Sequence, residues 1–189
     1  MIIYAETDRW ILRDLDSSDQ DGMYLLDSDP EVVKYLGGVT VRSPADSLKI
    51  IEYVQSQYRE FGIGRWAIQS KPTGEFIGWC GLKWVTERIN DQADFYDFGY
   101  RIRRPFWGQG FGTETAIASL QYGFNQLNLD PIIANVHQQN AASNHIIRKL
   151  GFKKTGEFFY MDQPQNWYEL TPAYFRFRHT DSAGPQHTF

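Results

Sequence analysis

RRPFWGQGFGTE, residues 103–114, joins a predicted strand to a predicted helix. The first N–H groups of a helix have no partner inside the helix, and the helix dipole favours an anion at that end. Glycine stands at positions 108, 110 and 112, where the missing Cβ atoms let a ligand approach the backbone closely. These features predict a cradle for a pyrophosphate group.

Two common phosphate-binding loops differ from this stretch. The dinucleotide-binding fingerprint needs a third glycine three residues after its second, where this chain has Thr113. A P-loop ends in Gly-Lys followed by Ser or Thr, and that triplet does not occur in the sequence. A tight turn without a ligand is the simple alternative, and the flanking segments must decide between the two.

Composition limits the class of protein. The chain has 189 residues, close to the ~150 of one domain, with a formal net charge of −4 that argues against a nucleic-acid-coating protein. No segment approaches the ~18 apolar residues of a membrane span, and Glu6 and Asp8 stand where a signal peptide would be apolar. Cys80 is the single cysteine, so it has no internal disulfide partner. We expect a cytoplasmic protein with neither nucleic acid nor membrane as partner.

Hydrophobic periods predict the elements around the glycine turn. The predicted strands are 9–15, 65–70, 75–85, 95–102, 131–138, 152–161 and 167–170, and the predicted helices are 16–26, 30–36, 44–61, 112–127 and 141–150. This order predicts a mixed α/β (α+β) fold, with one central sheet covered by helices on both faces. Residues 1–179 form the single predicted domain, and the polar residues 180–189 are predicted to be a disordered tail.

Three segments of the chain share their order and spacing with one family. They are Asp97–Ile102, Trp107–Glu114, and Asn140–Ser143 followed by Lys149–Phe152, and with their flanks they span about residues 9–170. In these segments the sequence resembles the GNAT acetyltransferase superfamily, most closely its RimJ/RimL-like branch of ribosomal-protein N-terminal acetyltransferases. The resemblance implies the GNAT fold, whose central twisted sheet is mostly antiparallel.

The resemblance also implies acetyl-CoA as co-substrate and no metal. It assigns the backbone of Tyr100, Arg101 and Ile102 to the pantetheine arm, and the pyrophosphate to the turn formed by Gly108, Gln109, Gly110, Phe111, Gly112 and Thr113. Asn140 is assigned to hydrogen bonding near the pantetheine, and Ser143 to the neighbourhood of the thioester sulfur. From the residues alone, Asn140 is equally explained as a helix N-cap.

The sequence departs from the general family pattern at two positions. Trp107 replaces the usual Arg or Gln before the glycines, which is typical of this branch. The tyrosine often used as general acid, seven residues after the asparagine, is Ile147 here. Ser143 therefore becomes the candidate acid, and Tyr168 is a second candidate donor, although a strand tyrosine is more often part of the core.

Acetyl transfer to an amine requires a neutral amine and a proton for the departing thiolate. Asp97 is the candidate base because strand alternation places it on the face opposite Phe98 and Tyr100. The alternative is an ion pair with Arg101, its neighbour on the same face. The sequence does not decide between the two.

The acceptor is less well defined by the sequence. Residues 86–97 carry a local charge of −3, which would attract a cationic amine or would simply form a solvated loop. The resemblance favours a protein N-terminal α-amine, with a small-molecule amine such as an aminoglycoside or a polyamine as the alternative. A non-catalytic acyl-CoA-binding module is the alternative from a different class, and a homodimer stays open.

Overall fold

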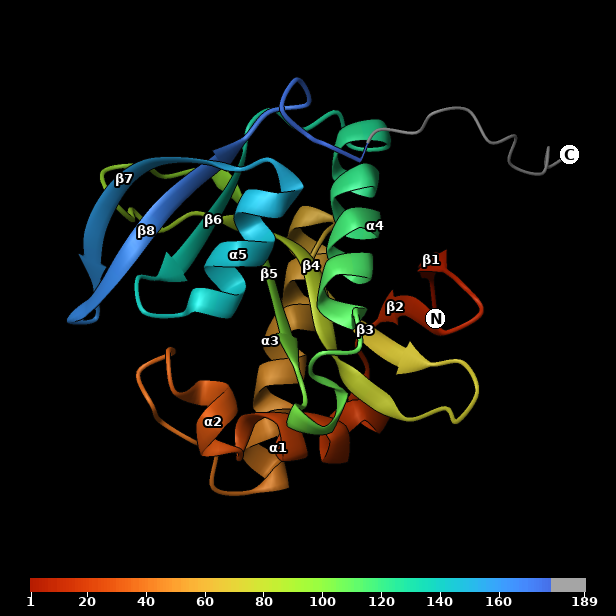
Figure 1. The fold of residues 1–189 in the computed structure, drawn as a ribbon. Coiled ribbons are helices and arrows are strands. Elements are labelled where there is room, and N and C mark those ends of the chain that lie inside the picture. Colours follow the sequence, from red (N-terminus) through yellow and green to blue (C-terminus); the bar gives the residue numbers. More distant parts are fainter. Residues whose placement is uncertain (178–189) are drawn as a thin grey trace, which may run out of the picture.

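Residues 1–177, which the computed structural model describes, form an eight-stranded sheet in the order β1-β2-β3-β4-β5-β6-β8-β7 (Figure 1). Its neighbours are antiparallel except for the parallel pair β5–β6. The tail expected at residues 180–189 lies outside the described residues. The strands are β1 Ile3–Glu6, β2 Trp10–Asp14, β3 Arg65–Ser70, β4 Phe76–Val85, β5 Phe95–Ile102, β6 Ile132–His137, β7 Lys153–Tyr160 and β8 Gln163–Leu170.

Helices cover both faces of this sheet, as the sequence predicted. Figure 1 shows α4 and α5 in front of the sheet, with α1 and α3 on the other face. The helices are α1 Gln20–Asp27, α2 Pro30–Val33, α3 Pro44–Phe61, α4 Phe111–Asn125 and α5 Ala141–Leu150, with short 3-10 helices at Ser17–Asp19 and Arg104–Phe106. None of the helices within residues 1–177 is long and apolar enough to cross a membrane.

The predicted and observed elements differ mainly at the two ends of the chain. Strand β1 was not predicted, because it has no local alternation signal and depends on pairing with β2 and on the stacking of Tyr4 on Trp66. Strand β8 begins four residues earlier than predicted, since Pro164 lies within the β7–β8 ladder opposite Phe159. Helix α2 ends at Val33 and not at residue 36.

The main hydrophobic core lies between the sheet and the α4–α5 layer. Trp66, Leu82 and Leu120 are fully buried there. Helix α4 comes close to the sheet at Gly123, where a Cβ atom would lie 2.7 Å from Leu82 Cδ1. A smaller cluster around Ile51 packs α1 and α3 against the opposite face. Burial at about 25 cal/mol per Å² of apolar area is the main force that fixes both helical layers.

Strands β5 and β6 diverge in the middle of the sheet. Their only paired residues are Tyr96 with Ile132 and Asp97 with Ile133. Figure 1 shows the two strands separating beyond this point, with the start of α4 and the start of α5 near the opening. The rest of β5 therefore presents a backbone edge that no other described strand pairs with.

Candidate functional site

The glycine turn leads from β5 into α4 as predicted. Gly108 and Gly110 have φ values of +71° and +90°, a region that residues with a Cβ atom seldom adopt. No hydrogen bond within residues 1–177 reaches the amides of residues 108–112. Successive free N–H groups at the start of a 15-residue helix fit an anionic diphosphate.

An arginine from the start of the chain holds this turn in place. Arg9 donates to the carbonyl of Gln109 at 2.8 Å and forms an ion pair with Glu114, and its guanidinium lies over the Phe111 ring. The indole Nε1 of Trp10 donates to the other oxygen of Glu114 at 2.9 Å. These contacts neutralise a carboxylate that would otherwise repel a phosphate. Sequence analysis missed Arg9, because no local signal links residues about a hundred positions apart.

Arg9→Gln is expected to weaken acetyl-CoA binding by about 3- to 10-fold, since Glu114 then stands uncompensated at the phosphate site. Isothermal titration calorimetry at low ionic strength measures the change. Glu114→Gln in the Arg9→Gln background should restore affinity, because it removes the charge that Arg9 neutralises. Equal affinity of Arg9→Gln and the wild type would contradict this role.

Successive residues of β5 point their backbone N–H and C=O groups alternately toward β4 and toward the divergence from β6. The carbonyl of Arg101 faces β4, where it lies 2.1 Å from the position a Cβ atom on Gly78 would take. By alternation, the backbone groups of Tyr100 and Ile102 face the divergence. The Ile102 carbonyl accepts a 2.7 Å hydrogen bond from Trp107 Nε1, which ties the glycine turn to the strand end. Arg101 thus differs from the expectation that its backbone also faces the co-substrate.

The start of α5 lies across the divergence from β5. Asn140 caps the helix by accepting from the Ser143 amide at 3.1 Å, so the predicted cap is confirmed. The Tyr100 hydroxyl donates to Ser143 Oγ at 3.2 Å, a contact that sequence analysis missed. Burial raises the pKa of Tyr100 to about 12, so this hydroxyl keeps its proton at neutral pH.

The other two positions considered for the general acid lie in the core. Ile147 is 2% exposed and packs in the main cluster, so no polar group replaces the missing tyrosine at that position. Tyr168 is 1% exposed, and its hydroxyl donates to Asn144 Oδ1 at 2.7 Å. The Tyr168 proton is therefore used in a hydrogen bond to the buried side-chain amide of Asn144 on α5. Of the two candidate donors, Ser143 is the one at the divergence.

Asp97 lies on the opposite face of β5, which α1 and α3 cover. Its Oδ2 atom accepts from Arg65 of β3, and Arg65 also donates to the carbonyls of Asp97 and Gly81. The alternative ion pair between Asp97 and Arg101 is therefore wrong. Arg101 instead pairs with Asp27 at the end of α1. Among the hydrogen bonds of residues 1–177, none reaches Asp97 Oδ1, which leaves that oxygen free to accept a proton.

Most of the acidic segment lies away from this site. Asp91 and Asp94 line a separate hollow beside Trp84 and Tyr96, at the other end of β5. Both residues are exposed in the loop before β5, which fits the solvated-loop interpretation for them. Asp97, from the end of that segment, lies beside the divergence.

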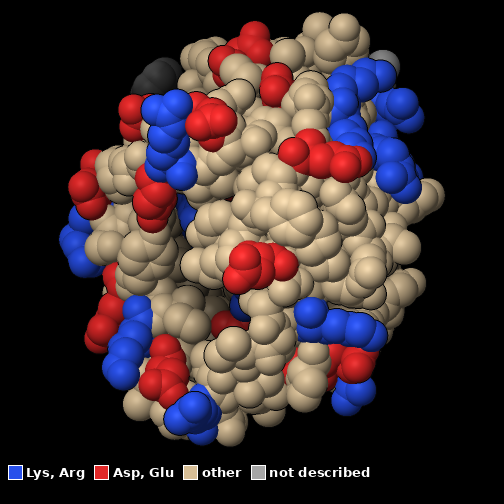
Figure 2. All heavy atoms as spheres, turned by 90° about the vertical axis from the view of Figure 1, so that its left-hand side faces the viewer, with Lys and Arg blue, Asp and Glu red and all other residues tan. Residues whose placement is uncertain are grey.

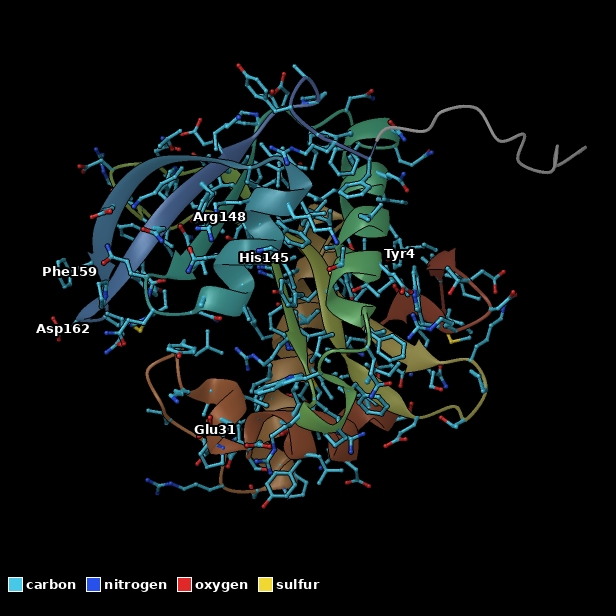
Figure 3. The ribbon with its side chains drawn as sticks, viewed as in Figure 1. Tyr4, Glu31, His145, Arg148, Phe159 and Asp162 are labelled. Atoms are coloured by element: carbon cyan, nitrogen blue, oxygen red, sulfur yellow. The ribbon has the colours of Figure 1, made fainter. Side chains whose placement is uncertain are left out.

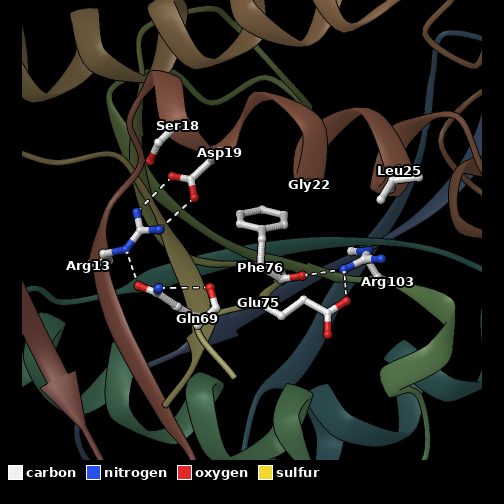
Figure 4. Close-up of a pocket in the computed structure, with 10 residues that line it drawn as sticks. Arg13, Ser18, Asp19, Gly22, Leu25, Gln69, Glu75, Phe76 and Arg103 are labelled. Carbon is white, nitrogen blue, oxygen red and sulfur yellow. Dashed lines mark hydrogen bonds and ion pairs between the residues drawn. The ribbon is translucent and has the colours of Figure 1, made fainter. Parts of the chain in front are cut away.

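A second pocket lies between α1 and the β3–β4 hairpin (Figure 4). Arg13 donates to both oxygens of Asp19 and to Gln69 Oε1. At the other side of the pocket, Arg103 pairs with Glu75. Its charged side chains are thus bound to one another, which indicates a structural role.

The remaining reactive groups do not form a site. Cys80 is fully buried, and burial raises the pKa of its thiol to about 11, so it is a poor nucleophile at neutral pH. Residues 1–177 bring no three His, Cys, Asp or Glu side chains together in a way that could hold a metal ion.

The β5–β6 divergence and the glycine turn at the start of α4 lie side by side at the centre of the sheet (Figure 1). Residues 9–153 match the acetyltransferase (GNAT) domain, and the chain belongs to the GNAT family. It is therefore an acyltransferase, of a family that uses acetyl-CoA.

Curated relatives agree with this assignment. The chain is 33% identical over 146 residues to the uncharacterized protein YkkB of Bacillus subtilis, which covers 77% of this chain and 82% of YkkB. It is 32% identical over 156 residues to the uncharacterized N-acetyltransferase YoaA of the same species, covering 82% and 86%. It is 28% identical to the FsC-acetyl coenzyme A-N(2)-transacetylase of Aspergillus fumigatus, over 71% of this chain and 58% of that protein.

Solved structures share the fold at low sequence identity. A GNAT-family acetyltransferase from Bacillus anthracis has a TM-score of 0.72 at 21% identity, covering 90% of this chain and 98% of that one. The ribosomal-protein-S5-alanine acetyltransferase of Vibrio fischeri has a TM-score of 0.71 at 16% identity, covering 93% and 100%. RimL, a ribosomal L7/L12 α-N-protein acetyltransferase solved with coenzyme A, has a TM-score of 0.73 at 18% identity, covering 90% and 98%. These likenesses confirm the GNAT fold.

Proposed function

We propose that this protein transfers an acetyl group from acetyl-CoA directly to the α-amine of a peptide or protein N-terminus. One observation carries the proposal. Where β5 leaves β6, the glycine turn and Ser143 lie toward the α4–α5 face, whereas the free oxygen of Asp97 lies on the α1–α3 face. The thioester and the amine can then approach the same point from opposite sides of the sheet.

The residues of the divergence fit acetyl-CoA. The free amides of residues 108–112 hold the diphosphate, and the β5 edge at Tyr100 pairs with the amide groups of the pantetheine arm. Gly112 leaves room for the Tyr100 ring, whose Cε2 atom would lie 3.3 Å from an added Cβ. The ring thereby stays close to Ser143 at the end of the arm.

The two faces then divide the proton transfers. Asp97 takes the proton of the amine, through a water molecule, as the nitrogen forms its bond to the acetyl carbon. The carbon–sulfur bond breaks, and Ser143 donates its proton to the departing sulfur. Ser143 Oγ accepts from Tyr100, which leaves the serine hydrogen free to point elsewhere. The hydrogen bond from Tyr100 stabilises the serine oxygen during this transfer. Water then returns a proton to Ser143 while Asp97 releases its proton to water, so both residues regain their starting state.

Exposed apolar side chains after α2 and at the β7–β8 turn offer a surface on which a peptide acceptor can bind. Leu36 and Val39 follow α2, and Phe159 and Met161 lie at the β7–β8 turn, all at least 55% exposed. Figure 3 shows Phe159 near the turn of the β7–β8 hairpin, on the same side of the molecule as the α2 segment that carries Glu31. Figure 2 looks onto this end of the molecule and shows a hollow with charged atoms at its bottom. Side chains after a peptide's first residue would contact this apolar rim.

A small-molecule amine is the second candidate acceptor. It is supported by the likeness to the Aspergillus transacetylase, and by 35% identity over 81 residues, 43% of this chain, to the spermidine N(1)-acetyltransferase of Escherichia coli. The first name states acetyl transfer from coenzyme A to an N(2) position, and the second names spermidine, a polyamine.

Mass spectrometry of an amine panel tests the proposed function. We expect the protein, given acetyl-CoA, to add one acetyl group to ribosomal-protein N-terminal peptides in preference to polyamines and aminoglycosides. Ser143→Ala should lower kcat by about 10- to 100-fold while the Kd for acetyl-CoA stays unchanged, because it removes a proton donor and no binding group. Acetylation confined to polyamines or aminoglycosides would overturn the peptide assignment, and an unchanged kcat would remove Ser143 from the reaction.

A further inference from the structure

Lys83 is a cation without an ion-pair partner on the α1–α3 face of the sheet, within residues 1–177. This is the face from which the amine is proposed to approach, and it is called the acceptor side below. It lies on β4 directly opposite Asp97 in the β4–β5 ladder, so the two side chains share the α3 face. Lys83 is only partly exposed, yet it forms no hydrogen bond or ion pair in the part of the chain that the structure describes. Burial, and secondly the charge of Arg65, lower the pKa of its ammonium group.

The neighbouring charges are already compensated. Asp97 is bound to Arg65, and Asp27 is bound to Arg101. Glu87, in the exposed segment after β4, acts on Lys83 only through space, with no ion pair between them. Lys83 therefore has charged neighbours but no direct ion-pair partner within residues 1–177, and a partly desolvated ammonium without a direct partner is unfavourable in the free protein.

Further unpartnered polar atoms occur on the acceptor side. On α3, Gln57 is 4% exposed and donates to the Tyr53 hydroxyl, but its Oε1 atom has no partner in the described structure. On β6, the buried Asn135 Oδ1 atom is also unpartnered. Buried polar atoms are nearly always hydrogen-bonded in folded proteins, so these two unpartnered acceptors, one on α3 and one on β6, favour a ligand surface on this side of the sheet.

We propose that Lys83 binds a carboxylate of the acceptor, and that the enzyme selects amines with a carboxylate on the same residue or the next one. This inference rests on the proposed function. Directly opposed strand residues have Cβ atoms about 4.5–5.5 Å apart. Lys83 and Asp97 can thus hold the carboxylate and the amine of one short unit. A polyamine would instead bring further positive charge toward Lys83.

The test centres on two peptide acceptors that differ only in one carboxylate, with two small amines for comparison. Peptides beginning Ser-Asp and Ser-Asn, free aspartate and spermidine are assayed with the wild type and with Lys83→Gln and Lys83→Met. We expect the wild type to favour Ser-Asp over Ser-Asn by about 10- to 100-fold in kcat/KM, mainly through KM. Both variants should reduce this preference to within about two-fold. Free aspartate acetylated as well as the Ser-Asp peptide would identify a small amino acid as the source of the carboxylate.

Lys71→Gln is the matched control, because Lys71 lies in the β3–β4 turn and pairs with Glu6, away from the acceptor side. It should leave the preference unchanged. Calorimetry of the two peptides with the CoA-loaded protein gives a readout that needs no turnover, and Lys83→Gln should abolish the tighter binding of Ser-Asp. Equal use and equal binding of both peptides by the wild type would overturn the carboxylate site while leaving acetylation intact. Acetylation of neither peptide, with Ser-Asp still bound more tightly, would support the Lys83 site and overturn the proposed function.

Discussion

Gly110→Val is expected to raise the Kd for acetyl-CoA by at least about 100-fold, the loss of two or more charge-assisted hydrogen bonds. Gly110 has a φ of +90°, which a β-branched residue cannot adopt without strain. An added Cβ atom would lie 2.9 Å from Glu114 Oε1, and Arg9 and Trp10 hold that carboxylate in place. The valine would displace the amides that meet the diphosphate. Isothermal titration calorimetry with acetyl-CoA measures the effect.

Gly74→Val is the matched control for backbone strain. Gly74 lies in the β3–β4 turn with a φ of +71°, so valine meets a similar conformational penalty there. It lies outside the glycine turn, and we expect a lower melting temperature with an unchanged Kd for acetyl-CoA. A Gly110→Val protein that binds acetyl-CoA within three-fold of the wild type would show that the turn is not the diphosphate site.

The second large effect is expected at Asp97. Asp97→Asn should reduce kcat/KM for the amine by about 10²- to 10⁴-fold, the usual contribution of a general base. Asparagine has nearly the same shape and keeps an oxygen for Arg65, so acetyl-CoA binding should stay within two-fold of the wild type. Steady-state kinetics and calorimetry on the same preparation separate the two quantities.

The pH dependence gives a sharper readout for Asp97. Only a neutral amine attacks the thioester, and the neutral fraction rises with pH. The rate of Asp97→Asn should therefore climb steadily with pH, and its deficit relative to the wild type should shrink above about pH 9. Asp94→Asn, the same change in the exposed loop before β5, should leave the profile unaltered. A constant deficit across the pH range would indicate that Asp97 holds Arg65 in place and transfers no proton.

Local signals in the sequence predicted the parts of the site that depend on neighbouring residues. Strands β3 and β5 have the predicted bounds, and the period of two correctly put Asp97 and Arg101 on one face. The N-cap interpretation of Asn140 followed from its position just before a predicted helix, and the structure confirms it. These features follow from φ preferences, caps and side-chain alternation, which act over a few residues.

Pairings between distant segments could not be predicted in this way. Asp97 and Arg101 share a face, yet each binds a partner from another element, Arg65 and Asp27. Tyr100 was predicted for its backbone alone, because nothing in the sequence shows that its ring reaches the start of α5. Strand register and helix packing decide such contacts, and many weak contacts along the whole chain determine both.

The sequence by itself determined the glycine turn and the order of the elements after β1, because these depend on backbone conformation and hydrophobic period. The GNAT class was reached from the sequence through the resemblance of its motifs to that family. Only the tertiary structure decided that Arg9 neutralises Glu114, that Ser143 accepts from Tyr100, and that Lys83 has no direct ion-pair partner within residues 1–177. Each of these depends on which side chains the folded sheet and helices bring within a few ångströms of one another, and charge compensation at that range is set by three-dimensional position.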